Sequence, residues 1–199
     1  MIGEDTLVRL ADALPEDVVL VLDGAYAEYA RGYGSDYDGG AALAASRKNV
    51  VMTRTFSKLY GLGGLRVGWG YASQEIIDVL NRVRGPFNLS VPALAAAEAA
   101  VLDRDFAENC IAENAEMREV LRSALLEMGI SCDASDANFV LARFSNQEEA
   151  EAAEKALRED GILVRKVAGY GFPEGLRITV GAREGTARVM SSISAFMGV

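Results

Sequence analysis

The chain has 199 residues, of which 50% are hydrophobic, and its formal net charge is −9. This composition is typical of a globular protein with one core or two small ones, and it excludes a disordered chain. The acidic balance without a basic run argues against nucleic acid as a partner. The complete absence of histidine excludes hydrolases that use a histidine base and most zinc sites, so we expect no metal.

Two further features concern the compartment. No apolar run is long enough to span a bilayer, and the first residues lack a signal-peptide pattern, so we expect no membrane partner. Cys110 and Cys132 are too few for a disulfide framework. These observations favour a reducing cytoplasm.

The first predicted elements are an amphipathic helix over residues 5–13 and a strand over residues 18–22. The strand is a continuous apolar run, which is typical of a parallel strand buried on both faces. Asp23 follows it, and open α/β sheets place ligand-binding groups at the carboxyl ends of such strands. A turn or cap aspartate is an equally good interpretation of Asp23 by itself. Residues 31–40 are rich in glycine and tyrosine and predict a loop, and residues 41–46 predict one or two helical turns.

The segment that follows carries the strongest functional signal. A short strand over residues 50–52 leads to the hydroxyls of Thr55 and Ser57 and to Lys58, and Arg66 follows three glycines before a strand over residues 66–71. Hydroxyls and a planar guanidinium suit a phosphate group, and glycines let the backbone approach it closely. A lysine near other cationic charge can attack a carbonyl and form a Schiff base. A lone Ser-Lys pair would more often belong to an ordinary surface loop, and it is the neighbours that favour a site.

The rest of the chain predicts alternating helices and strands. A helix is predicted over residues 73–84 with Ser73 as its cap, and a long helical region over residues 92–128 with a kink or link at residues 103–105. Strands are predicted over residues 137–144, 162–165 and 176–180, and helices over residues 146–160, capped by Asn146, and 184–197. We place a domain boundary near residue 105.

Two arginines in the second part stand on or beside strands that should be largely buried, Arg165 and Arg177. A buried cation without a partner is costly, so each should meet an anion. A structural salt bridge and a ligand site are equally good interpretations at this point.

Several of these segments resemble one family. Thr55-Phe56-Ser57-Lys58 and Gly61-Leu62-Gly63-Gly64-Leu65-Arg66-Val67-Gly68 resemble the lysine segment of the fold-type I, pyridoxal-phosphate-dependent aminotransferases. The longer run from Arg54 to Leu62 is most similar to the histidinol-phosphate aminotransferase branch. Asp23-Gly24-Ala25-Tyr26 resembles the family's Asp-Glu-Ala-Tyr, with Gly24 in place of the glutamate, and Pro86-Phe87-Asn88 and Leu176-Arg177-Ile178-Thr179-Val180-Gly181 resemble two later family segments.

The resemblance implies a fold and a site. The fold would be α/β, with part of the large cofactor-binding domain and its mostly parallel sheet in residues 1–104, and a small α+β carboxyl-terminal domain in residues 105–199. Lys58 would hold pyridoxal 5′-phosphate covalently, Asp23 would pair with the pyridine nitrogen and Tyr26 with the phenolic oxygen. Thr55, Ser57 and Arg66 would hold the phosphate, and Arg165 and Arg177 the acidic group of the substrate.

The implied activity is transamination between a small-molecule amino donor and a 2-oxo acid, in a homodimer. The donor and acceptor would be histidinol phosphate and 2-oxoglutarate, giving imidazole acetol phosphate and glutamate in histidine biosynthesis. An aromatic amino acid aminotransferase, a threonine-phosphate decarboxylase and a catalytically silent interaction module remain alternatives. The resemblance covers only the carboxyl-terminal half of such an enzyme, so we expect this chain alone to be weakly active or inactive.

Overall fold

The computed structural model describes residues 2–30 and 38–199, so most of the loop predicted over residues 31–40 lies outside the described residues. The chain divides into two compact units, residues 1–111 and 112–199. This division falls inside a helix that begins at Arg104, so the limits predicted at residue 105 remain a proposal. None of the helices in the described part of the chain combines the length and the apolar character that crossing a bilayer requires.

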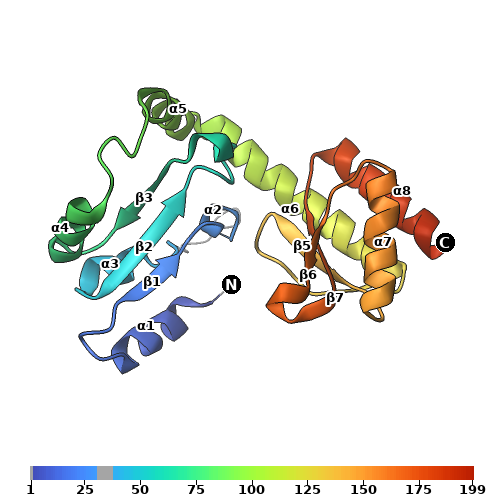
Figure 1. Ribbon diagram of the computed structural model, residues 1–199, viewed down its shortest axis with the longest axis horizontal. Helices are drawn as coiled ribbons and strands as arrows, with labels where there is room; N and C mark the ends of the chain where they lie inside the picture. The colour runs from blue at the N-terminus through green and yellow to red at the C-terminus, as the bar shows by residue number, and fades with distance from the viewer. Residues whose placement is uncertain (1, 31–37) are drawn as a thin grey trace. The chain divides into compact units, whose positions relative to one another are not determined.

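The first unit combines a small sheet with short helices (Figure 1). The strands are β1 (Leu20–Asp23), β2 (Val50–Thr55) and β3 (Gly68–Tyr71). The helices are α1 (Glu4–Ala13), α2 (Ala27–Ala30), α3 (Ala41–Ser46), α4 (Gln74–Val83), α5 (Val91–Leu102) and the start of α6 (Arg104–Glu127), with a short 3-10 helix η1 (Gly63–Leu65). The sheet order is β1-β2-β3, with β1 parallel and β3 antiparallel to β2.

One face of this sheet forms the core of the unit. Alternate residues of a strand point to the same face, so Val50 and Met52 of β2 and their partners Leu20 and Leu22 of β1 lie together. Leu7 and Ala11 of α1 and Leu43 and Ala44 of α3 pack against them. Removing one large apolar side chain from water contributes about 1.5–3 kcal/mol, so this cluster fixes the position of β1 and β2.

The element bounds differ from the prediction where pairing or packing decides them. The first strand begins at Leu20, because only Leu20 onward pairs with β2. The prediction that this strand is buried on both faces is wrong, since Val21 is 58% exposed. The second strand extends to Thr55, because that residue pairs with Gly68 of β3. The prediction that Arg66 opens the third strand is wrong, since Arg66 has a left-handed backbone (φ 54°) and the strand begins at Gly68.

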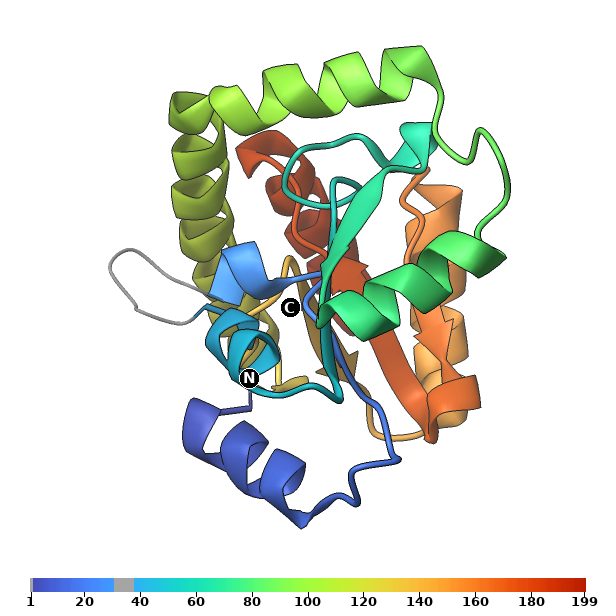
Figure 2. The same cartoon turned by 90° about the vertical axis from the view of Figure 1, so that its left-hand side faces the viewer.

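Two predictions about helix ends have different outcomes. The link predicted at residues 103–105 is confirmed: the chain changes direction sharply at Asp103, between α5 and α6 (Figure 2). Ser73 is the N-cap residue of α4, as predicted, but its side chain does not bond to the helix, because its hydroxyl donates to the carbonyl of Lys48 at 2.9 Å instead.

The second unit packs helices against an antiparallel sheet with the strand order β4-β5-β7-β6. Its elements are β4 (Ser131–Cys132), β5 (Phe139–Arg143), α7 (Gln147–Glu159), β6 (Arg165–Val167), the 3-10 helix η2 (Ala168–Tyr170), β7 (Phe172–Thr179) and α8 (Arg183–Met197). The strand predicted over residues 162–165 is wrong except for Arg165, which opens β6. The cap at Asn146 is confirmed, because its side chain accepts from the N–H of Glu149 at 2.9 Å.

The core of this unit lies on one face of its sheet. Val140 and Ala142 of β5 and Leu176 and Ile178 of β7 alternate with outward residues and are almost fully buried. Met117, Leu121 and Leu125 recur at helical spacing on α6 and join them in one hydrophobic cluster. The predicted α/β class is therefore confirmed, with a separate α+β unit at the carboxyl end.

Candidate active site

The turn after β1 positions two of the predicted site residues. Asp23 ends the strand, and one of its carboxylate oxygens accepts from the N–H of Ala25 at 3.1 Å. The N–H of Gly24 donates to the carbonyl of Thr53 at 2.9 Å, which continues the β1–β2 pairing into the turn. Tyr26 then lies between this turn and α2. The turn aspartate and the ligand-binding aspartate, which the sequence left as alternatives, are compatible, because the Asp23 carboxylate is exposed and has further acceptor sites.

The loop that carries Lys58 is anchored by buried apolar residues on both sides of it. Phe56, Leu59 and Val67 are buried, while Ser57 and Lys58 between them are partly exposed. The N–H of Phe56 donates to the carbonyl of Val67 at 3.2 Å, which closes the loop at its base. Phe56 and Val67 also pack with Ala93 and Ala97 of α5. The hydrophobic side chains therefore fix the loop, and the polar ones are held at its surface.

Hydrogen bonds bring Thr55, Ser57 and Arg66 together around this loop. The Thr55 hydroxyl accepts from the N–H of Ser57 at 3.0 Å and keeps its own proton available for another acceptor. Arg66 donates to the Ser57 hydroxyl at 3.4 Å and to the carbonyl of Gly63 at 2.7 Å. The left-handed backbone at Arg66 is uncommon for a residue with a side chain. Two hydroxyls and a guanidinium at one loop form a set of donors for a phosphate-like anion.

Lys58 and Tyr26 meet although they come from different segments. The Lys58 Nζ lies 5.3 Å from the centre of the Tyr26 ring, within the range of a cation–π contact. The turn after β1 and the loop after β2 are thus adjacent, as the parallel pairing of these strands requires. The first unit therefore holds an amine, a phenol and an anion-binding loop together, with a carboxylate at the end of the neighbouring strand.

The two arginines predicted in the second unit lie directly opposite one another on neighbouring strands. Arg165 of β6 pairs with Arg177 of β7, so both side chains share one face of the sheet. The expectation that both are largely buried is wrong: Arg165 is exposed on the edge strand and Arg177 is half-buried. Each guanidinium lies over an aromatic ring instead, Arg165 over Tyr170 at 5.5 Å and Arg177 over Phe139 at 5.0 Å.

Neither of these arginines forms an ion pair with a carboxylate in the part of the chain that the structure describes. Arg165 donates to the Tyr170 hydroxyl at 2.9 Å. The Nε of Arg177 is buried and has no hydrogen-bond partner among the described residues. Like charges directly opposite on paired strands repel, so this face favours an added anion.

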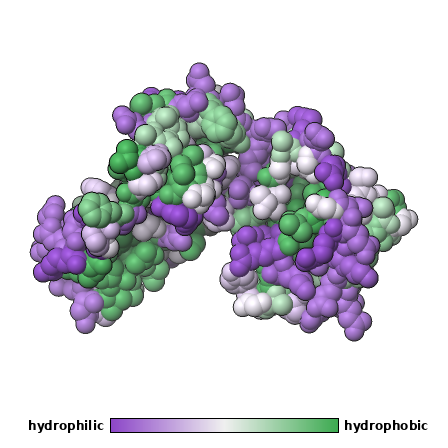
Figure 3. Space-filling view, turned by 45° about the horizontal axis from the view of Figure 1, so that its top comes forward, coloured by the Kyte–Doolittle hydropathy of each residue, from purple (hydrophilic) through white to green (hydrophobic). Residues whose placement is uncertain are grey.

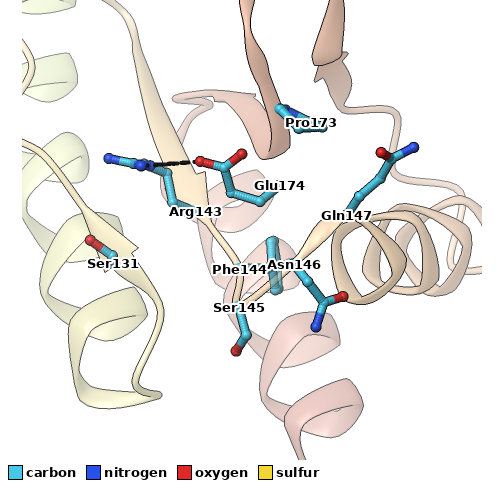
Figure 4. Close-up of a pocket in the computed structure, with 8 residues that line it drawn as sticks. All are labelled: Ser131, Arg143, Phe144, Ser145, Asn146, Gln147, Pro173 and Glu174. Atoms are coloured by element: carbon cyan, nitrogen blue, oxygen red, sulfur yellow. Dashed lines mark hydrogen bonds and ion pairs between the residues drawn. The ribbon is translucent and has the colours of Figure 1, made fainter.

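A third arginine on the same sheet face is already neutralised. Arg143 of β5 forms an ion pair with Glu174 of β7 at 3.1 Å, beside an open pocket of about 440 Å³ (Figure 4). The pKa of Glu174 is lowered, first by a backbone hydrogen bond and then by Arg143. No predicted site residue lines this pocket. Arg143 has a carboxylate partner, whereas Arg165 and Arg177 have none among the described residues.

Sequence reasoning overlooked Arg54, whose side chain is 9% exposed and contacts three segments of the first unit. It donates to the carbonyls of Gly24 and Asp38 and lies near Glu28. Its partners are up to 30 residues away in the chain, so no local pattern marks it. Arg54 opens the run that resembles one family branch, and it stands in a strand otherwise made of apolar and hydroxyl residues, but neither signal indicates what its side chain contacts.

Known proteins resemble this chain over nearly its whole length. A histidinol-phosphate aminotransferase of Roseobacter denitrificans is 62% identical over 198 residues, which is 100% of this chain and 54% of that protein. One of Dinoroseobacter shibae is 61% identical over 196 residues, with 98% and 53% covered. The crystal structure of histidinol-phosphate aminotransferase from Sinorhizobium meliloti in complex with pyridoxal-5′-phosphate has a TM-score of 0.89 and 27% identity, over 99% of this chain and 53% of that chain.

The chain thus spans about half the length of these relatives. The model of the family described as aminotransferase class I and II matches residues 1–193. Because this match covers far more than half of the sequence, the chain belongs to the aminotransferase class I and II family.

Proposed function

We propose that this protein is a pyridoxal-phosphate-dependent aminotransferase that interconverts histidinol phosphate and 2-oxoglutarate with imidazole acetol phosphate and glutamate. The observation that carries the proposal is the loop after β2, where Lys58 follows Ser57, the hydroxyl that Arg66 contacts, and its Nζ lies over the ring of Tyr26. The names of relatives that are more than 60% identical support the choice of substrate. The cytoplasmic location and the domain limits 1–104 and 105–199 remain predictions of the sequence.

The donor set of the first unit fits pyridoxal phosphate. Its aldehyde needs an amine, which Lys58 offers. Its phosphate needs cationic and hydroxyl donors, and Arg66 and Ser57 are already within 3.4 Å of one another. Its pyridine nitrogen needs a carboxylate and its phenolic oxygen a hydroxyl, which Asp23 and Tyr26 can supply. Thr55 adds a further hydroxyl beside Ser57.

Each residue then has a defined task. When bound, pyridoxal phosphate supplies an electron sink for the bonds of the substrate's α-carbon. Lys58 would hold the cofactor covalently through Nζ and, once the substrate's amine has displaced it, would take the proton from the substrate's α-carbon. The Asp23 carboxylate would keep a proton on the pyridine nitrogen, and the Tyr26 hydroxyl would donate to the phenolic oxygen. Arg66 would bind the phosphate, which suits its planar guanidinium.

Arg165 and Arg177 bind the acidic group of the amino donor or the 2-oxo acid. Their support is the pair of opposed guanidinium groups on one sheet face, without a carboxylate partner among the described residues. A planar guanidinium matches a carboxylate or a phosphate in two hydrogen bonds, so the pair suits both 2-oxoglutarate and histidinol phosphate.

The test of the cofactor site is chemical. The protein is loaded with pyridoxal phosphate, reduced with borohydride, digested and mapped by mass spectrometry, and the pyridoxyl group is expected on Lys58. A label on Lys48 or Lys155 would contradict the proposal. A panel of histidinol phosphate, aromatic amino acids and phosphothreonine then tests the substrate. Any amino transfer to 2-oxoglutarate, which we expect to be weak in this chain alone, should come only from histidinol phosphate. Transfer from aromatic amino acids, or decarboxylation of phosphothreonine, would reassign the reaction.

We also propose that the protein forms a homodimer through the apolar surface at the turn between α4 and α5. Phe87 is 97% exposed and has a left-handed backbone, and Val83 and Val91 beside it in sequence are also exposed. Hydrophobic residues reach the surface of the first unit in Figure 3. A Phe87→Ser variant should raise the dissociation constant of the dimer in sedimentation equilibrium, whereas an unchanged dimer would exclude this surface.

A further inference from the structure

Arg54 has a buried side chain that joins three segments of the first unit. Its Nη2 donates to the carbonyl of Asp38 at 2.5 Å, and its Nη1 donates to the carbonyl of Gly24 at 3.4 Å. The same Nη1 lies 3.8 Å from a carboxylate oxygen of Glu28. The guanidinium therefore contacts the turn after β1, the helix α2 and the segment before α3.

Two glycines leave the space that this guanidinium occupies. A Cβ added to Gly39 would lie 2.4 Å from the Arg54 Nη2, and one added to Gly24 would lie 3.1 Å from its Nε. Gly39 also has a positive φ of 65°, which side chains rarely adopt. The backbone thus passes close to Arg54 on two sides, which excludes water from much of its surface.

The contacts of Arg54 lie next to the turn that carries Tyr26, whose ring faces Lys58. Gly24 stands between Asp23 and Tyr26 in the turn, and Arg54 itself is in the strand that leads to Lys58. The distance of 5.3 Å between the Lys58 Nζ and the Tyr26 ring therefore depends on how firmly the turn is held against β2.

We propose that Arg54 is a positioning residue: its buried guanidinium ties the turn that carries Asp23 and Tyr26 to the strand that carries Lys58, and so sets the geometry of the cofactor site without touching the cofactor. The effect of Arg54 on the cofactor site rests on the proposed function. The contact that holds the turn against β2 does not.

The physical reason is the free energy lost when a buried hydrogen-bond donor is removed and its acceptors are left without a partner. A buried cation is tolerated only when acceptors surround it, and here two carbonyls and a carboxylate converge on one guanidinium. When Arg54 is truncated, the carbonyls of Gly24 and Asp38 lose a donor and Glu28 loses a nearby cation. The turn then gains freedom, and Tyr26 moves relative to Lys58.

Hydrogen exchange tests the tie in the cofactor-free protein. The variants are Arg54→Met, which keeps the bulk but removes every donor, and Arg54→Lys, which keeps the charge. The matched control is Arg47→Met, because Arg47 forms an exposed ion pair with Asp12 at 2.5 Å in the same unit. Arg54→Met should speed amide exchange in residues 23–30 and 38–42 by at least about tenfold relative to α7, with a smaller effect in Arg54→Lys and none in Arg47→Met. Unchanged exchange in Arg54→Met would overturn the proposal.

Cofactor binding separates a positioning role from a merely structural one. Arg54→Met should raise the Kd for pyridoxal phosphate by about 10- to 100-fold, because a displaced Asp23 or Tyr26 loses its hydrogen bond to the cofactor, and one bond to a charged group is worth about tenfold or more in affinity. It should also shift the midpoint of the pH titration of the bound cofactor's absorbance, with partial recovery in Arg54→Lys. Faster exchange with both the Kd and the pH midpoint unchanged would mean that Arg54 is only structural.

The same experiments separate a failure of the proposed function from a failure of the proposed role of Arg54. If the unsubstituted protein shows neither cofactor absorbance nor a pyridoxyl label on Lys58 after borohydride reduction, the proposed cofactor site fails, and the hydrogen exchange data still decide whether Arg54 holds the turn. If Arg54→Met does not fold, Arg54→Lys and Glu28→Gln carry the comparison. In that case wild-type exchange and wild-type Kd in both variants would overturn the proposal.

Discussion

Arg66 offers the sharpest quantitative prediction for the cofactor site. Its guanidinium is exposed, donates to Gly63 and Ser57, and keeps further N–H donors for an anion. One hydrogen bond between charged partners contributes about 1.5–3 kcal/mol, and each 1.4 kcal/mol is about tenfold in affinity. Arg66→Met should therefore weaken pyridoxal phosphate binding by about 10- to 150-fold. The lower end is favoured, because the side chain is exposed to solvent.

The assay is a titration of the protein with pyridoxal phosphate, followed by absorbance and by borohydride labelling of Lys58. Arg66→Gly removes the same guanidinium but suits the left-handed backbone at this position, so it should show the same loss of affinity in a chain of equal or higher stability. The Kd of Arg66→Lys should lie between those of Arg66→Met and the unsubstituted protein, because an ammonium keeps the charge but cannot make two parallel hydrogen bonds.

A matched control is Arg9→Met, since Arg9 is also exposed in the first unit, lies outside the turn proposed for the dimer and donates to the Thr6 hydroxyl at 3.2 Å. Its Kd should equal that of the unsubstituted protein. A Kd for Arg66→Met within twofold of the unsubstituted protein would refute the phosphate role of Arg66.

Three other substitutions have defined outcomes. Gly68→Ala should lower the free energy of unfolding by about 1–3 kcal/mol in urea titrations, because its Cβ would lie 2.7 Å from the carbonyl oxygen of Arg54; an unchanged midpoint would contradict this. Arg177→Met should raise the KM for 2-oxoglutarate about 10-fold or more without changing the cofactor absorbance; an unchanged KM would make Arg177 structural. Burial acts to raise the pKa of Asp38, but backbone hydrogen bonds and Arg54 outweigh it and lower the pKa from its ordinary 3.8. Its ionised form therefore contributes stability that is complete above pH 3.8 and is lost as the pH falls through the lowered pKa, so Asp38→Asn should destabilise at pH 7 and cease to do so in acid. A difference that is constant with pH would contradict this reasoning.

Local patterns predicted most of the elements because their cause is local. The helix over residues 147–159 follows from Asn146 as its cap, and α8 follows from the apolar spacing in residues 184–197. The exact limits of strands could not be read in this way, because partners far away in the chain decide them. Thr55 belongs to β2 only because Gly68 lies opposite, and residues 162–164 stay outside β6 although their sequence is apolar.

The candidate site also has a part that the sequence predicted and a part that depends on distant contacts. The residues from Thr55 to Arg66 lie within one loop, and their hydrogen bonds connect neighbours in the sequence, so the motif could be read directly. The contact between Lys58 and Tyr26 joins two loops, and parallel pairing of β1 with β2 was needed to bring them together. Arg54 was overlooked because its role depends on carbonyl groups, which every residue has and which no sequence pattern reveals.

Arg165 and Arg177 of the second unit are less buried than the sequence predicts, yet they still lack a carboxylate partner among the described residues. The sequence argument assumed burial, and Arg165 is instead exposed. The need for an anion nevertheless remains, since the β6–β7 register sets Arg165 directly opposite Arg177. Arg143 on the same face shows what a purely structural arginine does here, because Glu174 neutralises it on the neighbouring strand. All three guanidinium groups lie over aromatic rings, but only that of Arg143 also has a carboxylate partner among the described residues. This difference supports the proposal that Arg165 and Arg177 bind an anionic substrate.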